Sequence, residues 1–297
     1  MDNQQKAYCY GLGAVLCWST VATAFKLSLA YLSPAQLVLV SSLVSWMFLA
    51  VALVCNRGLS AITDASPAAT LRAMALGVLN PFLYYLVLFQ AYALLPAQEA
   101  QALNYTWALT MALLAVPLLR HPLGAGELLA ALVCYGGVLV IATRGQLLSL
   151  EFAHPLGVGL ALLSTVLWAL YWILNTGEKN DPLVVLFLNF SFALPILFGY
   201  CLWQGELRAM PWQGLAGAAY IGVFEMGLSF VLWLNAMRLT RSTIRISSLI
   251  FIAPPLSLVL IHFVLGETIL GSTLVGLGLI LAGLALQHLR RGQGSPE

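Results

Sequence analysis

The most informative absence in this sequence is electrical charge. Only 8% of the 297 residues are Asp, Glu, Lys or Arg, whereas soluble domains contain about 25% of these residues. A soluble protein of this size could not cover its surface with so few ionised groups. Hydrophobic residues make up 61% of the chain, a composition that suits a lipid environment. We therefore expect an integral membrane protein.

Other absences exclude several classes of function. The net charge is only +2 and no basic run is longer than Arg290-Arg291, so nucleic acid is not expected as a partner. The five cysteines lack a CxxC spacing and four of them lie in apolar runs, so we expect them to pack and not to form disulfides. HExxH, GxSxG and P-loop motifs are missing, and the four histidines lack metal-ligand spacing. We expect no metal, no cofactor and no enzymatic activity.

What is present is a series of long apolar runs. A helix needs roughly 17–25 residues to cross the ~30 Å hydrocarbon core. Because backbone groups in lipid must be bonded within their own segment, and the alternating pattern of a barrel is missing, each run is predicted to be an α-helix. Pro81, Pro117, Pro195 and Pro254-Pro255 are expected to kink these helices. The ten predicted spans lie near residues 7–30, 34–55, 72–95, 97–119, 124–143, 156–176, 182–204, 212–237, 242–264 and 268–288.

The positively charged residues predict the orientation of the chain in the membrane. If the N-terminus is cytoplasmic, ten Lys and Arg residues lie in or beside the inner segments and three lie in or near the outer ones. Positive charge is retained on the cytoplasmic side of membrane proteins. We therefore expect a multi-pass protein of the inner (plasma) membrane with both termini in the cytoplasm.

An internal repeat relates the two halves of the chain. We expect the halves at 1–145 and 150–290, followed by a cytoplasmic tail at 291–297. Each half has five spans, and this odd number makes the second half enter the membrane from the opposite side. The predicted fold is therefore all-α, with ten transmembrane helices in two inverted five-helix repeats. The matches that indicate the repeat are Gly77, Ala91 and Leu94 with Gly222, Ala236 and Leu239, Gly126-Glu127 and Gly136 with Gly266-Glu267 and Gly276, and Trp18 with Trp168.

These features resemble a known family. The ten-span pattern, Trp18 and Trp168 in the leading helices, and the Gly-Glu pair before the last helix of each half resemble the drug/metabolite transporter superfamily, in particular its EamA-like branch. The stretch from Glu225 to Glu267, with Pro254-Pro255, is similar to the second-half signature of that branch. The resemblance implies a basket of helices around a central cavity, with export of amino acids or related metabolites as the commonest activity. Four-span multidrug relatives carry a proton-binding glutamate in their first helix, and the first span here has no acid.

Charged side chains inside the spans are candidates for function, because each costs about 2.5–3.5 kcal/mol at a helix centre. Glu225 lies midway along its span, and Ser229 and Trp233 follow one and two turns later on the same face. Glu225 could bind a proton or a cationic amine, or it could be a hydrogen-bonded structural carboxyl. Arg245 could bind a substrate carboxylate through two hydrogen bonds, or its side chain could extend to the cytoplasm beside Arg241.

Polar and aromatic stripes on three other spans predict the walls of a binding cavity. Asn and Gln side chains would be costly in lipid, so these faces should point inward. Aromatic walls with a few amides suit an amphipathic organic solute, although helix packing and an interfacial aromatic belt are the alternatives. The residues of the stripes are Ser164, Trp168, Tyr171, Trp172 and Asn175 in 156–176, Asn80 and Tyr84 in 72–95, and Gln98, Gln101, Asn104 and Tyr105 in 97–119.

The sequence and the resemblance together predict a secondary transporter. We expect an exporter of amino acids or related small organic metabolites that works by alternating access between its two halves. An uncoupled facilitator of small solutes and a non-transporting membrane sensor or assembly subunit are the alternatives, and the last would have no water-filled cavity between the halves. The expected partners are a small-molecule substrate and the lipid bilayer, and the chain is expected to act as a monomer or homodimer.

Overall fold

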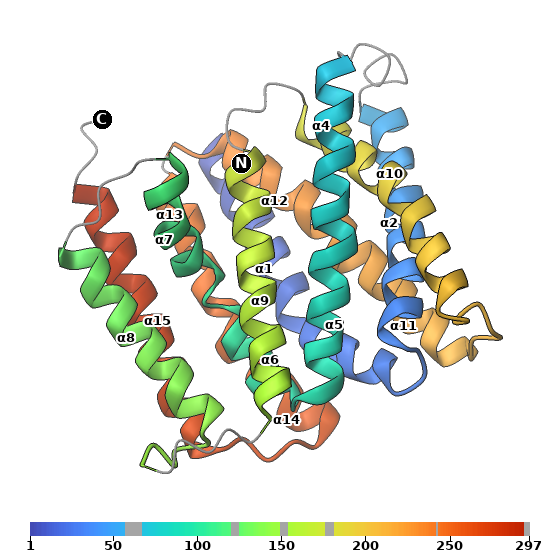
Figure 1. The fold of residues 1–297 in the computed structure, drawn as a ribbon. Helices are drawn as coiled ribbons and strands as arrows, with labels where there is room; N and C mark the ends of the chain where they lie inside the picture. The colour runs from blue at the N-terminus through green and yellow to red at the C-terminus, as the bar shows by residue number, and fades with distance from the viewer. Residues whose placement is uncertain (57–66, 120–124, 149–153, 176–180, 242, 294–297) are drawn as a thin grey trace.

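The computed structural model describes residues 1–56, 67–119, 125–148, 154–175, 181–241 and 243–293, and this part of the chain is helical apart from short connections (Figure 1). The helices of the first half are α1 (Asn3–Leu29), α2 (Pro34–Asn56), α4 (Pro67–Gly77), α5 (Tyr84–Leu94), α6 (Ala97–Asn104), α7 (Trp107–Leu119) and α8 (Ala125–Ala142). Those of the second half are α9 (Pro155–Asn175), α10 (Pro182–Trp203), α11 (Trp212–Val223), α12 (Ser229–Leu239), α13 (Thr243–Ser247), α14 (Ala253–Leu265) and α15 (Gly271–Gln293).

The helices confirm the all-α membrane class but not the number of spans. Within the described residues, eight helical segments are long and apolar enough to cross a membrane. The last helix of each half contributes a shorter apolar stretch, Leu128–Ala142 in α8 and Gly271–Gln287 in α15. Ten complete spans therefore stay a prediction. The start of α1 and the end of α15 lie on the same side of the bundle (Figure 1), and α15 continues to Gln293, past the predicted start of the tail.

Short polar motifs fix the starts of helices where the chain turns. Before α2, the Ser33 hydroxyl accepts from the Gln36 backbone N–H at 3.2 Å, and the Gln36 side chain accepts from the Ser33 N–H at 3.0 Å. This reciprocal pair satisfies backbone donors that the helix leaves free. Before α10, Asp181 accepts from the Leu183 N–H at 2.8 Å, and Pro182 occupies the first turn.

The last helices of the two halves pack antiparallel along one edge of the bundle (Figure 1). A Cβ on Gly137 would lie 2.4 Å from the Gly276 carbonyl oxygen, and a Cβ on Gly283 would lie 2.8 Å from the Cys134 Cβ. Residue numbers that rise along α8 therefore meet numbers that fall along α15. Glycines at these positions let the two backbones approach closely, which is how helices associate in lipid.

The second helices of the two halves are also antiparallel. Near the start of α2, the Ala35 carbonyl accepts from the Cys201 thiol at 3.5 Å, close to the end of α10. Further along α2, the Trp46 indole N–H donates to the Ser191 hydroxyl at 2.8 Å. Two pairs of repeat-related helices thus run in opposite directions. Antiparallel pairs of this kind are what two inverted repeats require.

The third helix of each half is interrupted at the same repeat position. A π-helical segment, Val78–Leu83, separates α4 from α5, and a second one, Phe224–Leu228, separates α11 from α12. Each follows a glycine that lies against the second helix of the other half. A Cβ on Gly77 or on Gly222 would lie 2.5 Å from a backbone carbonyl oxygen of that helix.

The fourth helix of each half is broken as well. α6 ends at Asn104 and α7 begins at Trp107, while a 3₁₀ segment, Ser248–Ile252, joins α13 to α14. The predicted span at 97–119 corresponds to the helical segment Ala97–Leu119, in which the helix is interrupted at Tyr105–Thr106. In lipid, irregular backbone is tolerated only where protein or a cavity surrounds it. The two π-helical segments and Thr106 at the break between α6 and α7 are buried in the bundle. The segment Ser248–Ile252 has no buried residue but packs against α1.

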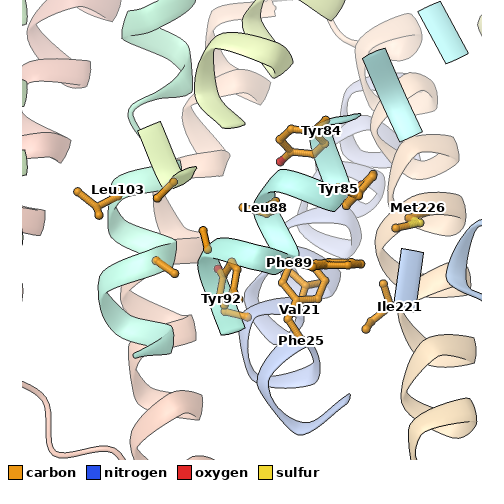
Figure 2. Packing of buried hydrophobic residues seen from close by; sticks show 14 of the residues in the cluster. Val21, Phe25, Tyr84, Tyr85, Leu88, Phe89, Tyr92, Leu103, Ile221 and Met226 are labelled. Carbon is orange, nitrogen blue, oxygen red and sulfur yellow. The ribbon is translucent and has the colours of Figure 1, made fainter. Parts of the chain in front are cut away.

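Buried aromatic side chains hold the C-terminal part of α1 against α5 (Figure 2). The Phe25 ring lies 4.8 Å from the Phe89 ring and 5.1 Å from the Tyr92 ring, both in edge-on geometries. Aromatic pairs in these geometries stabilise packing beyond the area they bury. This cluster forms the floor under the candidate site.

A candidate solute-binding cavity

A cavity lies between the two halves, at the level of the irregular segments. It leaves about 820 Å³ free of atoms, including the open solvent at its mouth. Both halves contribute to its walls, chiefly through α1, α5, α6, α9 and α12. The residues that line it are Trp18, Val21, Phe25, Tyr84, Leu88, Tyr92, Gln101, Asn104, Tyr105, Trp107, Trp168, Trp172, Glu225, Phe230, Trp233 and Ile250.

The cavity walls are mainly aromatic. The Trp168 ring stacks on the Tyr84 ring at 4.5 Å and meets the Trp107 ring edge-on at 6.5 Å. Across the cavity, the Trp18 ring lies 5.2 Å from the Trp233 ring. Trp18 and Trp168 are equivalent residues of the two repeats, so each half supplies one tryptophan from its first helix. Rings held against one another in this way form rigid, apolar walls.

Among the described residues that line the cavity, Glu225 is the only one with a carboxyl group. It lies on the π-helical segment Phe224–Leu228 and is 8% exposed. The Tyr85 hydroxyl donates to its Oε1 atom at 3.2 Å. The other oxygen, Oε2, is buried, and no group in the described part of the chain donates to it. A buried polar atom without a partner is costly, so this oxygen is suited to a ligand that brings a donor.

Two amides add neutral polar groups to the cavity. Gln101 and Asn104 lie one turn apart on α6, and the Asn104 amide nitrogen donates to the Ser164 hydroxyl at 3.0 Å. Ser164 in turn donates to the Ala161 carbonyl, one turn earlier in α9. Ser164 thus holds the Asn104 side chain in place and does not itself line the cavity.

The structure brings most of the predicted site residues to this cavity or to a smaller one beside it. Trp168, Trp172, Tyr84, Gln101, Asn104, Tyr105, Trp233 and Glu225 line the main cavity. Tyr171 and Asn175 line the smaller cavity, which leaves about 590 Å³ free of atoms and shares Trp172 and Phe230 with the main one. Asn80, Ser229 and Arg245 line neither of them.

The positions of these three residues have physical reasons. A π-helical segment holds more residues per turn than an α-helix, so the cavity face passes from Glu225 to Phe230, and Ser229 turns away to donate to the Glu225 carbonyl. Asn80 is buried in the equivalent segment, where its own backbone is extended. Arg245 is exposed on α13, as expected if its side chain extends to the membrane surface.

Sequence reasoning missed several cavity residues because they are apolar. Phe230 and Ile250 carry no polar atom, and none of Trp107, Phe230 and Ile250 carries a repeat signal that distinguishes it from packing residues. Trp18 was identified only as a marker of the repeat. Its equivalence to Trp168 was the signal that could have placed it in the cavity.

The end of the bundle opposite the termini is held together by a polar cluster. The Glu267 carboxylate accepts from the Ala97 N–H at 2.8 Å and the Gln98 N–H at 3.3 Å, at the start of α6. The Gln98 side chain donates to the Thr268 carbonyl at 2.9 Å and accepts from the Leu270 N–H at 3.0 Å. These bonds join α6 of the first half to the connection between α14 and α15.

The Lys26 and Arg144 side chains add further hydrogen bonds at the end of the bundle opposite the termini. The Lys26 ammonium donates to the Tyr92 and Leu95 carbonyls at 2.7 and 2.8 Å, at the end of α5. The Arg144 guanidinium donates to the Glu99 carboxylate at 2.8 Å. We call the bonds of Lys26, Gln98, Glu99, Arg144 and Glu267 the polar latch. It ties α1, α5, α6 and the α14–α15 connection together beyond the cavity.

Comparisons with known proteins agree with this architecture. The model of the EamA-like transporter family matches the chain twice, at residues 5–143 and 155–287. The two matches correspond to the two inverted halves. A solved crystal structure of another protein covers 98% of this chain and 99% of its own, with a TM-score of 0.67 and 23% sequence identity. At this identity the likeness concerns the fold alone. No curated protein matches the chain.

Proposed function

The chain belongs to the EamA-like transporter family, and on that premise we propose that it is a secondary transporter that carries small organic solutes by alternating access. One observation carries the proposal: a solute-sized aromatic cavity lies between two inverted halves and contains a buried carboxylate. A membrane sensor or assembly subunit has no need of such a cavity. The inverted relation matters because each half can adopt the conformation of the other, which moves the opening from one side to the other.

The polar latch supports one half of this cycle. It closes the end of the bundle away from the termini through bonds between the first and second halves. By the repeat offsets, the equivalent contact at the other end involves Glu127 and residue 242. The Glu127 side chain and residue 242 lie outside the described part of the chain. In the proposed cycle the latch breaks when the cavity opens to its own side.

We base the proposed direction of transport and the proposed membrane on the sequence. The excess of Lys and Arg at one side supports cytoplasmic termini in a plasma membrane, which places the polar latch at the outer face. The resemblance to metabolite exporters supports export of amino acids or related solutes. Glu225 is proposed to couple solute movement to protons, since a buried carboxyl group can carry one.

Purified protein in liposomes tests the proposal. A panel of labelled solutes is offered with and without a pH gradient, and the solute that is carried is then measured with the Trp168→Ala variant. We expect gradient-dependent accumulation that Trp168→Ala reduces at least tenfold. Trp212, which is 73% exposed, gives a matched control, and Trp212→Ala should transport normally. Equilibration without accumulation would identify an uncoupled facilitator, and no movement of any solute would refute transport.

A further inference from the structure

The charges around the cavity restrict the chemistry of the solute. Glu225 is its only charged lining residue, and no Lys, Arg or His belongs to the described residues that line it. The cavity is therefore electronegative as well as aromatic. This restriction concerns the same site as the proposed function and rests on it.

The Glu225 carboxylate has room for a charged donor. Tyr85 occupies Oε1, while Oε2 is buried and without a donor in the described chain. A hydrogen bond from a cationic donor to a carboxylate is about twice as strong as a bond between neutral groups. An ammonium group on the solute would supply both the missing donor and the compensating charge. A neutral or anionic solute would supply at most one of these.

The aromatic walls favour the same kind of solute. Ammonium groups are attracted to the faces of Trp and Tyr rings within about 6 Å. Trp18, Trp168, Trp233 and Tyr84 present such rings around the cavity. The same walls can bury an aromatic or aliphatic body, because their surface is mainly apolar. A solute with a cationic head and an apolar body therefore satisfies both features of the cavity.

A solute carboxylate finds no matching partner. The Lys26 ammonium already donates to two carbonyls, and Arg144 is paired with Glu99. Arg245, the arginine that sequence reasoning offered for a carboxylate, is exposed and outside the cavity lining. Gln101 and Asn104 are neutral amides, which supply no compensating positive charge, and Asn104 donates one of its N–H groups to Ser164. A carboxylate in the cavity would be unpaired and repelled by Glu225.

From this arrangement we infer that the cavity takes aromatic monoamines, which carry an ammonium group but no carboxylate, in preference to the corresponding amino acids. Amino acids are the solutes that the family resemblance alone suggests. The inference narrows the proposed function to a decarboxylated class of solute. Glu225 binds the ammonium group, and the tryptophans bind the ring.

A matched set of solutes tests the inference. Phenethylamine, phenylalanine and phenylacetate share one ring and chain and differ only in their charged groups. Binding of each to the purified protein is measured by calorimetry at neutral pH, because a free amine can cross liposomes unaided. We expect phenethylamine to bind at least tenfold more tightly than phenylalanine, and phenylacetate to bind most weakly. Equal or tighter binding of phenylalanine would overturn the inference.

Variants separate a specific role of Glu225 in amine binding from a general loss of the folded cavity. Glu225→Gln should weaken phenethylamine binding at least tenfold, while benzyl alcohol, a neutral analogue, should bind as it does to the wild type. If Glu225→Gln binds phenethylamine as well as the wild type does, the assignment of the ammonium site is wrong. Should this variant not fold, the wild-type comparison still decides the preference.

Failure of the inference and failure of the proposed function give different results. Transport of phenylalanine without binding of phenethylamine refutes the inference and leaves the transporter intact. Binding of phenethylamine without transport of any solute refutes transport and supports the cavity preference.

Discussion

Removing the Glu267 carboxylate tests the polar latch most directly. It accepts one hydrogen bond at 2.8 Å and two at 3.3 Å, from Ala97 and from the backbone and side chain of Gln98. A hydrogen bond to a charged group contributes about 1.5–3 kcal/mol, and negative charge at a helix N-terminus adds about 0.3–1 kcal/mol. The long bonds and the partial exposure of Glu267 reduce this sum, so we expect Glu267→Ala to destabilise the closed end by about 1.4 kcal/mol.

A difference of 1.4 kcal/mol corresponds to a tenfold change in an equilibrium, so the open end should become on the order of tenfold more populated. A cysteine at Gln101, in a background without the five native cysteines, reports this opening. Gln101 lines the cavity and is 4% exposed. An impermeant maleimide is added to the outer face of oriented vesicles, and the labelling rate is followed with time.

The expected result is a labelling rate about tenfold higher in Glu267→Ala, with a smaller increase in Glu267→Gln, which keeps one acceptor oxygen. Glu206→Gln is the matched control, because it removes an acid from the same end of the bundle outside the polar latch. If Glu267→Ala labels at the rate of the parent protein, the latch does not hold the outer end closed.

Three other predictions follow. Gly137→Ala should destabilise the protein by about 1–3 kcal/mol through overpacking, because its Cβ would lie 2.4 Å from the Gly276 carbonyl oxygen. Gly136→Ala is the control: its Cβ would have no atom within 4 Å, and thermal unfolding should be unchanged. Trp46→Phe should lose the bond to Ser191, worth about 0.5–1.5 kcal/mol, with a lower melting temperature and unchanged solute affinity. Amine binding, followed by calorimetry, should weaken as falling pH protonates Glu225, and Glu225→Gln should give a flat pH profile.

The helices and the inverted order could be predicted from the sequence because both depend on simple periodic signals. Apolar length identifies the spans, and the odd number of spans per half determines the inversion. The breaks could not be predicted in the same way. Pro81 lies in one π-helical segment, but the break between α6 and α7 at Tyr105–Thr106 has no proline, and the α-helix continues past Pro117 and Pro195. These breaks depend on contacts between distant segments.

The candidate site could likewise be predicted only in part. Polar residues such as Glu225 and Asn104 could be found because an amide or carboxyl group in lipid needs a reason to be there. Ser229 was placed on the cavity face by assuming regular α-helical spacing. The latch bond between Glu267 and Ala97 joins residues 170 positions apart, and no local pattern indicates such a pairing.

The irregular segments also determine which face of each third helix points to the cavity. The segment Phe224–Leu228 adds residues to a turn, so that α12 is rotated relative to α11. An α-helix advances about 100° per residue, so deleting one residue from Phe224–Leu228 would rotate α12 by roughly that angle. Phe230 and Trp233 would then point away from the cavity while Glu225 stayed in place. The ring wall and the carboxylate of the second half share one chamber because of this segment. In the first half the helix instead kinks at Asn80, whose backbone is extended, just before Tyr84.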